Sequence, residues 1–279
     1  MGITQTSRAG RGGLASPAVD PAYHTAGLLA RFDRISLSEL AHVSLLDRVD
    51  TKYVFDMSQL HAALRGALGC YRALEVERVR LNHYHTVYFD TPDFSLYHQH
   101  HNGLAMRYKV RERQYVDSDL AFLEVKRKTS QGRTVKARLQ ILEVETDLDR
   151  QAGRFIDAHT PLDERDLVPR LWNDYLRLTL VSMCRLERLT IDTSLSFGWR
   201  DVRVSLPGVA IAEVKQERFS FQSDFIRQMR ELGIQPTSFS KYCVGASLLY
   251  DGLKSNNFKQ HVRLLEKVMG REPVYEYLH

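Results

Sequence analysis

Charged residues recur at every second position between Gly103 and Arg138, and this spacing constrains the fold more than any other feature of the chain. The segment carries ten Lys or Arg against four acidic residues, a surplus of six positive charges, whereas the whole chain has a net charge of +5. The basic character is therefore local, which indicates a site for an anion. The ten cations are Arg107, Lys109, Arg111, Arg113, Lys126, Arg127, Lys128, Arg133, Lys136 and Arg138.

A spacing of two residues is the period of a β-strand, so alternate cations project from one face of each strand. These faces could form the solvated outer side of an antiparallel sheet. They could instead look inward, because intervening residues such as Tyr108, Val110 and Val125 are apolar and amphipathic helices are available to cover them. The same charged alternation recurs in Glu143, Glu145 and Asp147, in Arg188, Thr190 and Asp192, and in Glu213, Lys215 and Glu217.

The recurrence favours the inward arrangement, and we predict an α+β fold in which an antiparallel β barrel with a water-filled bore is flanked by helices. Arg and Lys in a bore suit a polyphosphate, because guanidinium groups bind phosphate oxygens in pairs and Lys adds point charge. Strands are expected over 48–55, 76–90, 122–128, 139–147, 188–197, 202–206 and 209–217, and helices over 58–68, 163–183, 221–232, 240–253 and 257–269. Residues 1–26 are expected to be a disordered tail, 27–255 the barrel domain and 256–279 a C-terminal helix.

The composition argues against several other classes of protein. Three widely separated cysteines, Cys70, Cys184 and Cys243, offer neither a disulfide framework nor a paired metal site, so we expect a reducing cytoplasm. No apolar run approaches the roughly 20 residues of a membrane span. Nucleic acid is not the favoured partner, because the positive charge is concentrated in one segment. A zinc site is a further alternative for the histidines, but no Cys or acid cluster accompanies them, so packed or solvent-facing histidines are favoured. The histidines concerned are His83, His85, His98, His100 and His101.

Seven short motifs occur in an order that resembles the VTC domain, the polyphosphate polymerase branch of the CYTH-like, or triphosphate tunnel, superfamily. The resemblance covers roughly residues 31–255. The motifs are Arg48-x-Asp50-x-Lys52-Tyr53, Tyr88-Phe89-Asp90-Thr91-Pro92, Arg111-x-Arg113-x-Tyr115, Phe122-x-Glu124-x-Lys126-x-Lys128, Arg188-Leu-Thr-Ile-Asp192, Glu213-x-Lys215 and Phe239-Ser240-Lys241-Tyr242.

The resemblance implies an antiparallel tunnel barrel that takes a nucleoside triphosphate and a divalent metal, commonly Mn or Mg. VTC-type members transfer the terminal phosphoryl group of ATP to a growing inorganic polyphosphate chain, and in some relatives a membrane-protein partner carries the product away. Glu213 matches the metal-binding glutamate of the family. Ser240 matches a phosphate contact at the start of a helix, where free backbone N–H groups also favour an anion.

The candidate site residues come from this match and from the basic faces. The family's tunnel cations correspond in position to Lys52, Arg111, Arg113, Lys126, Lys128, Arg188, Lys215 and Lys241. We assign catalysis to Lys52, Arg111, Arg113, Lys126, Arg188 and Lys215. We assign phosphate binding to Lys109, Lys128, Lys136, Arg138, Ser240 and Lys241, and metal binding to Glu213.

Each assignment has a simpler structural alternative. Glu213 could pair with a neighbouring Lys, and the same holds for Glu124, Glu143 and Glu145 as further metal ligands. Lys241 could be an exposed residue at a helix start, with Ser240 as a plain N-cap. Asp192 could orient Arg188 or merely share its sheet face.

Three functions remain open. Hydrolytic tunnel enzymes begin with a Glu-x-Glu-x-Lys strand, whereas this chain has Arg48 in the first acidic position, which favours the polymerase. The alternatives are a tunnel phosphohydrolase acting on triphosphate or a nucleoside triphosphate, and a non-catalytic module that binds polyphosphate.

Overall fold

The computed structural model describes residues 27–42, 48–131, 133–144 and 147–277. The predicted tail over residues 1–26 and the candidate ligand Glu145 lie outside the described residues. None of the helices in the described part of the chain is long and apolar enough to span a bilayer.

One antiparallel sheet organises the molecule. Each strand in its main path pairs with its neighbours in antiparallel orientation, and the path has two free ends, so hydrogen bonds do not close it into a ring. The order is β12 (Pro236–Thr237), β2 (Val49–Asp56), β11 (Val209–Gln216), β9 (Glu187–Trp199), β8 (Val168–Ser182), β4 (Leu81–Asp90), β5 (Arg107–Tyr115), β6 (Leu120–Lys128) and β7 (Thr134–Ile141).

Four short strands extend this sheet. The strand β3 (Tyr71–Leu74) pairs with β8, and β1 (Asp33–Ile35) pairs with β3 in parallel. The strand β10 (Val202–Leu206) pairs with β9, and the C-terminal β13 (Val274–Tyr277) pairs with β10. Residues 256–279, predicted as a helix alone, thus contain α8 (Lys259–Met269) followed by a strand of the sheet.

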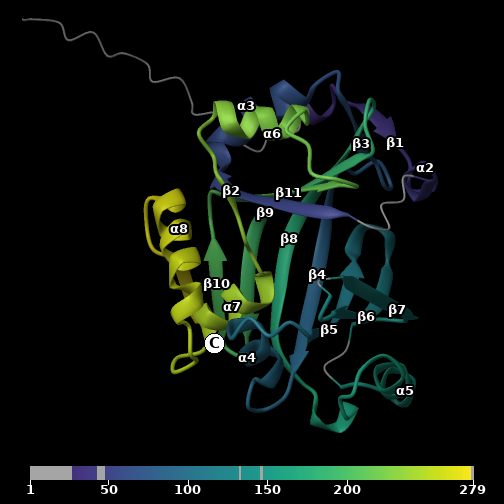
Figure 1. Ribbon diagram of the computed structural model, residues 1–279, viewed down its shortest axis with the longest axis vertical. Coiled ribbons are helices and arrows are strands. Elements are labelled where there is room, and N and C mark those ends of the chain that lie inside the picture. Colours follow the sequence, from purple (N-terminus) through teal and green to yellow (C-terminus); the bar gives the residue numbers. More distant parts are fainter. Residues whose placement is uncertain (1–26, 43–47, 132, 145–146, 278–279) are drawn as a thin grey trace, which may run out of the picture.

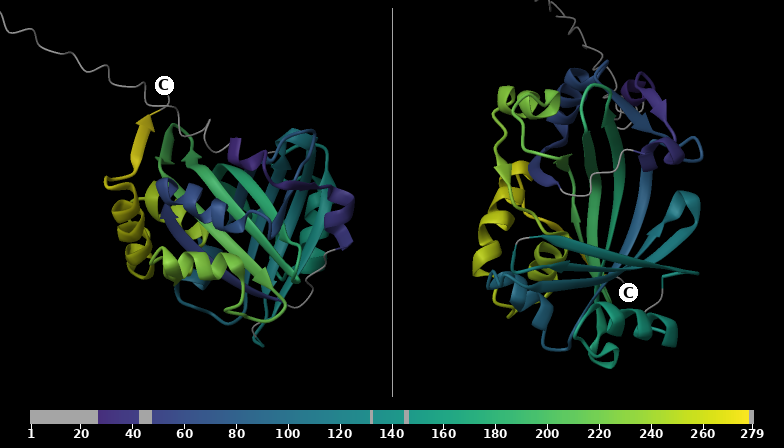
Figure 2. Two further views of the ribbon diagram at one scale, coloured as in Figure 1. Left: turned by 90° about the horizontal axis from the view of Figure 1, so that it is seen from above. Right: turned by 45° about the vertical axis from the view of Figure 1, so that its right-hand side comes forward.

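The sheet curls so that its two ends face one interior space, with β5, β6 and β7 running across the long strands β8 and β9 (Figure 2). Residues from β2 and from β7 line the same cavity, although the two strands do not pair. The predicted α+β tunnel architecture is confirmed, with the difference that the barrel has an open seam.

Alternation along each strand separates the polar interior from the apolar exterior, as expected for period-two side chains. On β11, for example, Glu213 and Lys215 face the cavity, whereas Ala212 and Val214 belong to an outer apolar cluster. Part of the hydrophobic core of this protein therefore lies between the outer face of the sheet and the helices that cover it.

Helices pack on the sheet in separate places, some on its outer face and some on its concave face (Figure 1). The pair α3 (Met57–Ala67) and α6 (Asp224–Glu231) packs with β2, β8, β9 and β11, and α5 (Arg150–His159) packs on β5 and β6. A further cluster joins α4 (Ser95–His101), α7 (Lys241–Leu249) and α8, and α7 contacts β8, β9 and β10. This cluster packs on the concave face of the sheet, because its Val54 and Ile211 share a strand face with the cavity-lining Lys52 and Glu213. Burying one large apolar side chain, such as Leu64 of α3, contributes about 1.5–3 kcal/mol.

Side-chain caps define several helix starts. Asp56 accepts a hydrogen bond from the backbone N–H of Ser58 at 2.6 Å, and Ser223 accepts one from Ile226 at 3.2 Å. Ser240 caps α7 through the N–H of Cys243 at 3.3 Å. Such caps satisfy N–H groups that a helix leaves without partners, and each typically stabilises the fold by about 1 kcal/mol.

The helix expected over 163–183 is wrong, because residues 168–182 form the strand β8. The residues Leu167, Leu171 and Tyr175 recur at a spacing of four, which fits a helix face and equally one face of a strand. The strand β8 is central in the sheet and carries apolar residues on both faces. Leu178 and Leu180 are buried under helices, and Tyr175 faces the cavity, so polar and apolar residues do not alternate throughout the strand.

Two smaller expectations also differ from the structure. The strand expected over 139–147 lies earlier in the chain, at Thr134–Ile141, and the helix α5 was not predicted. The strand or strand pair expected over 76–90 is β4 at Leu81–Asp90. Inward-facing cations make β7 unusually polar for a strand, so the sequence did not indicate where this strand begins.

Candidate active site

The concave face of the sheet encloses a cavity of about 840 Å³. It is lined by residues of β2, β4, β5, β6, β7, β8, β9 and β11 and by the start of α7. Twelve Lys or Arg line it against four acids, Asp50, Asp117, Glu124 and Glu213. The cations are Arg48, Lys52, Lys109, Arg111, Arg113, Lys126, Lys136, Arg138, Arg177, Arg188, Lys215 and Lys241.

Twelve of the thirteen candidate residues named from the sequence line this cavity, and Lys128 does not. Glu143 lies beyond the end of β7 and is not among the lining residues. Arg177 lines the cavity but was missed, because its segment was interpreted as a helix. Its signal is the period-two run from Arg177 to Leu180, in which Arg177 and Thr179 alternate with leucines.

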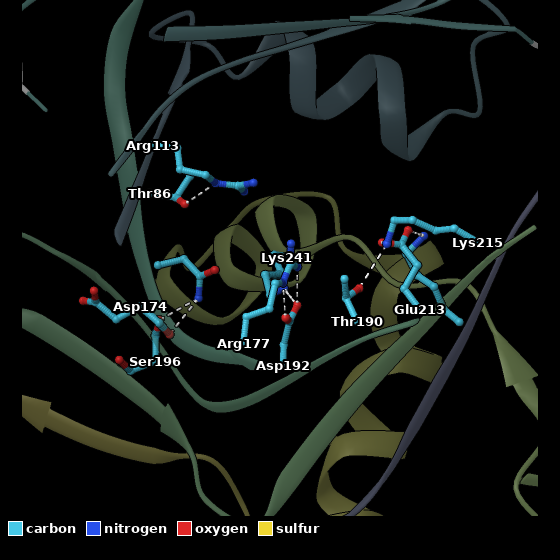
Figure 3. A network of polar contacts seen from close by, with 12 residues as sticks. Thr86, Arg113, Asp174, Arg177, Thr190, Asp192, Ser196, Glu213, Lys215 and Lys241 are labelled. Carbon is cyan, nitrogen blue, oxygen red and sulfur yellow. Dashed lines mark hydrogen bonds and ion pairs between the residues drawn. The ribbon is translucent and has the colours of Figure 1, made fainter. Parts of the chain in front are cut away.

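The first of three polar groups in the cavity joins β2 and β11. Glu213 accepts from Lys52 at 2.8 Å and also pairs with Lys215, whose ammonium donates to Thr190 at 3.0 Å (Figure 3). Burial alone raises the pKa of Glu213, but Lys215 and Lys52 outweigh it and hold that pKa well below the usual range. Burial lowers the pKa of Lys215 to about 8, although Glu213 opposes the shift. The simple pairing of Glu213 with neighbouring lysines is therefore present in this state.

The second group joins β8, β9 and α7. Arg177 donates two hydrogen bonds to the Asp192 carboxylate, at 2.6 and 2.8 Å, and Lys241 donates a third (Figure 3). Lys241 also lies over the ring of Tyr175, 3.9 Å from its centroid, and burial lowers its pKa to about 8. Asp192 thus holds Arg177 and Lys241. Of the two alternatives for Asp192, a shared sheet face with Arg188 is the one present, since Arg188 is not among its hydrogen-bond or ion-pair partners in the described part of the chain.

The third group lies on β5 and β6. Arg111 donates to Glu124 at 2.7 Å, and Arg113 donates to the hydroxyl of Thr86 at 3.2 Å. Burial alone raises the pKa of Glu124, but Arg111 and then Arg113 outweigh it and lower that pKa to about 2. Glu124 therefore orients Arg111 and stays ionised over the whole physiological range.

At the start of α7, Lys109 donates to the hydroxyl of Ser240 at 2.8 Å, and Ser240 is also the N-cap of that helix. The N-cap alternative for Ser240 is thus confirmed, while the hydroxyl and Lys241 both line the cavity. The first N–H groups of a helix attract anions, and two ammonium groups beside them strengthen that attraction.

Four lining cations form no hydrogen bond or ion pair with the described part of the chain: Lys126, Lys136, Arg138 and Arg188. Lys126 keeps contact with solvent inside the cavity. Partial removal from bulk water, together with Lys109 and Lys136, nevertheless lowers its pKa to about 7. Burial and Arg48 likewise lower the pKa values of Lys136 and Arg188. The cavity therefore holds cations that form no ion pair with its carboxylates, and an anionic ligand would relieve the repulsion between them.

The donor set can be tested for its fit to a divalent metal. Among the described residues, no group of three or more His, Cys, Asp or Glu is arranged to hold a metal ion. Mg²⁺ is commonly held by one or two carboxylates together with substrate phosphates and water. Glu213 thus fits a metal that arrives with a phosphate ligand, and a site made by protein groups alone does not fit. On β4, His83 and His85 form hydrogen bonds of 3.1 and 3.0 Å with Asp174, an acidic neighbour contributed by β8.

Comparison with solved structures finds low similarity over much of the chain. A candidate adenylate cyclase from Vibrio parahaemolyticus is 11% identical, with 71% of this chain and 97% of that chain covered and a TM-score of 0.44. A Hippeastrum protein described as a candidate adenylyl cyclase with a dominant triphosphatase activity is 15% identical, with coverage of 74% and 99% and a TM-score of 0.42. A Pyrococcus horikoshii protein is 13% identical, with coverage of 70% and 95% and a TM-score of 0.40. These scores are too low to carry an argument about this chain.

No curated protein matches the chain. The family model described as the VTC domain matches residues 47–250, which include every candidate site residue and all nine strands of the main sheet path. Since this match spans well over half of the sequence, the chain belongs to the VTC domain family.

Proposed function

We propose that this protein is a metal-dependent phosphotransferase that uses ATP to extend inorganic polyphosphate inside the basic cavity. The observation that carries the proposal is the charge balance of the cavity, in which twelve cations face four acids. Phosphoryl transfer through a loose transition state depends mainly on positioning and charge stabilisation, and it requires no covalent nucleophile. A surface rich in oriented cations supplies both.

The residues divide into two groups by their contacts. Arg111, held by Glu124, and Lys215, held by Glu213, are fixed in orientation, so they are suited to stabilise charge on the transferred group. We assign Lys52, Arg113, Lys126 and Arg188 to the same task. Lys109, Lys136, Arg138, Ser240 and Lys241 line the remaining wall, and we assign them to binding the phosphates on either side. A bound Mg²⁺ or Mn²⁺ would supply further positive charge at the reacting phosphate, and Glu213 is the residue that we assign to hold it.

The state of the carboxylates favours a phosphate acceptor over water. Water must lose a proton as it attacks, and a general base needs a pKa near the working pH. Glu124 and Glu213 are ion-paired with lowered pKa values, so they are poor bases. A terminal phosphate oxygen is already anionic and needs no base. This contrast supports the polymerase over the hydrolase.

A triphosphatase is the second candidate, and one observation favours it. Lys126 has a pKa lowered to about 7, so part of its population is neutral at physiological pH and can accept a proton from water. An anionic substrate would raise this pKa and reduce the neutral fraction, which makes the hydrolytic route the weaker of the two.

The proposal extends to the setting of the reaction. We place the protein in the cytoplasm because the chain's three cysteines are all unpaired, as a reducing compartment would keep them. ATP and polyphosphate are the proposed small-molecule partners. A membrane-protein partner that accepts the polymer is part of the proposal through the family resemblance alone.

The test is an incubation of the protein with ATP and Mn²⁺ or Mg²⁺, followed by gel analysis of polyphosphate and a separate assay for orthophosphate. Chain growth is the expected result. Orthophosphate release without chains would instead establish the hydrolase, and tight binding without turnover would establish a binding module. Arg111→Ala should weaken tripolyphosphate binding at least about tenfold, since a charge-assisted contact is lost. Arg127→Ala, on the opposite face of β6, is the matched control and should change nothing.

A further inference from the structure

Beyond the end of the cavity, the row of inward-facing cations continues along β5 and β6. Arg107 and Lys128 lie directly opposite each other in the register of these strands. Each is two residues from a cavity-lining cation, Lys109 on β5 and Lys126 on β6, so all four share one face of the sheet. The step between successive cations is about 7 Å along each strand.

The charges of these four cations also act on His100 of α4. Burial lowers its pKa to about 2, and Lys109, Arg107, Lys126 and Lys128 act in the same direction. The imidazole is therefore neutral at physiological pH. Its ring stacks on Phe258, with centroids 6.1 Å apart, while its buried Nδ1 has no hydrogen-bond partner among the described residues. A buried polar nitrogen without a partner is costly unless a ligand or water satisfies it.

Among the described residues, no carboxylate forms an ion pair with Arg107 or Lys128 in the way that Asp192 pairs with Arg177 and Lys241. Arg107 donates to the backbone oxygen of Leu104 at 2.6 Å, and within the described residues Lys128 forms no hydrogen bond or ion pair. Cations held together without an acid repel one another, so the arrangement favours an anion. The flexible stem of Lys128 and the fork of Arg107 can both reach phosphate oxygens.

We propose that Arg107 and Lys128 form an outer subsite for the distal phosphates of a polyphosphate chain whose reacting end lies in the cavity. This inference rests on the proposed function. A triphosphate occupies the cavity alone, whereas a longer chain continues along the cation row past Lys109 and Lys126. The subsite accounts for Lys128, which belongs to the basic pattern of the sequence and yet does not line the cavity.

The test compares two ligands, tripolyphosphate and long-chain polyphosphate, by calorimetric titration of the full chain. Lys128→Gln should weaken the binding of the long chain by about tenfold, as loss of one charge-assisted contact predicts, and should leave tripolyphosphate affinity unchanged. Arg127→Gln is the matched control, because it removes one positive charge from the residue directly before Lys128, on the opposite face of β6. This control variant should bind both ligands as the wild-type protein does.

Arg107→Gln provides a second variant with the same expectation, and equal unfolding temperatures verify that each variant is folded. An equal loss of both ligands would place these residues in the cavity site, and no loss of either would remove the subsite. Both results overturn this inference, but both leave the proposed function intact as long as the wild-type protein binds tripolyphosphate. Failure of the wild-type protein to bind tripolyphosphate would instead overturn the proposed function itself.

Discussion

The binding of a triphosphate to this protein should depend on pH through Lys126. Burial and the neighbouring lysines lower its pKa to about 7, and phosphate oxygens nearby would raise it. A group whose pKa rises on binding contributes affinity that is fully present below the free pKa and is lost as the pH rises toward the bound value. Affinity for tripolyphosphate should therefore decrease above about pH 7.

The size of the effect follows from the pKa values. If Lys126 stays protonated in the complex, a pKa of about 7 in the free protein weakens binding up to about tenfold between roughly pH 6 and 8. Tenfold is an upper limit, because Lys126 retains contact with solvent. Lys215 and Lys241, both with a pKa of about 8, add about twofold each over the same range.

The assay is calorimetric titration with tripolyphosphate at several pH values, for the wild-type protein and for Lys126→Arg. A guanidinium group stays charged throughout, so the variant keeps the positive charge and loses the titration. The ratio of the two affinities cancels the ionisation of the ligand itself. Wild-type affinity should fall relative to the variant as the pH rises, with about half a proton more taken up near pH 7. A ratio that is constant from pH 6 to pH 8 would refute this account of Lys126.

Three further predictions concern the ion pairs and the core. Asp192→Asn leaves Arg177 and Lys241 buried without a carboxylate, so the free energy of unfolding should fall by about 3–5 kcal/mol, and a loss below about 1 kcal/mol in urea denaturation would contradict the pairing. Glu213→Gln should retain tripolyphosphate binding but lower metal-dependent turnover at least about tenfold, and unchanged kinetics would remove Glu213 from the metal site. Leu64→Ala in α3 should cost about 2–5 kcal/mol in the same denaturation measurement without changing ligand affinity, since Leu64 is fully buried outside the cavity.

Much of the fold could be predicted because several strands have one polar face, which is solvated, and one apolar face, which is buried. The charged alternation in β2, β5, β6 and β11 identified both the strands and the side of each that carries cations. This alternation did not identify β8, because β8 is buried on both sides and shows no sustained alternation. For the same reason the sequence did not identify Arg177 as a cavity-lining residue. Local propensity also gave no signal for α5, whose buried residues are only Ala152, Gly153 and Ile156.

The pairing of charges was beyond the reach of the sequence. Glu213 faces Lys52 because β2 and β11 are neighbours in one register, and these residues are far apart in the chain. Asp192 meets Lys241 because α7 packs against β9. Such contacts depend on strand order and helix docking, which no short-range pattern encodes.

The sequence by itself determined that a surplus of positive charge lies at strand spacing on particular faces, since the backbone period is a local property. Only the tertiary structure decided which cations are neutralised and which are left for a ligand. Curling of the sheet brings Lys136 of β7 and Lys52 of β2 to one cavity, and there Glu213 compensates Lys52 whereas Lys136 has no ion pair with a described residue. The reason is physical: the energy of a charge depends on its neighbours in space and on its distance from water, and folding sets both.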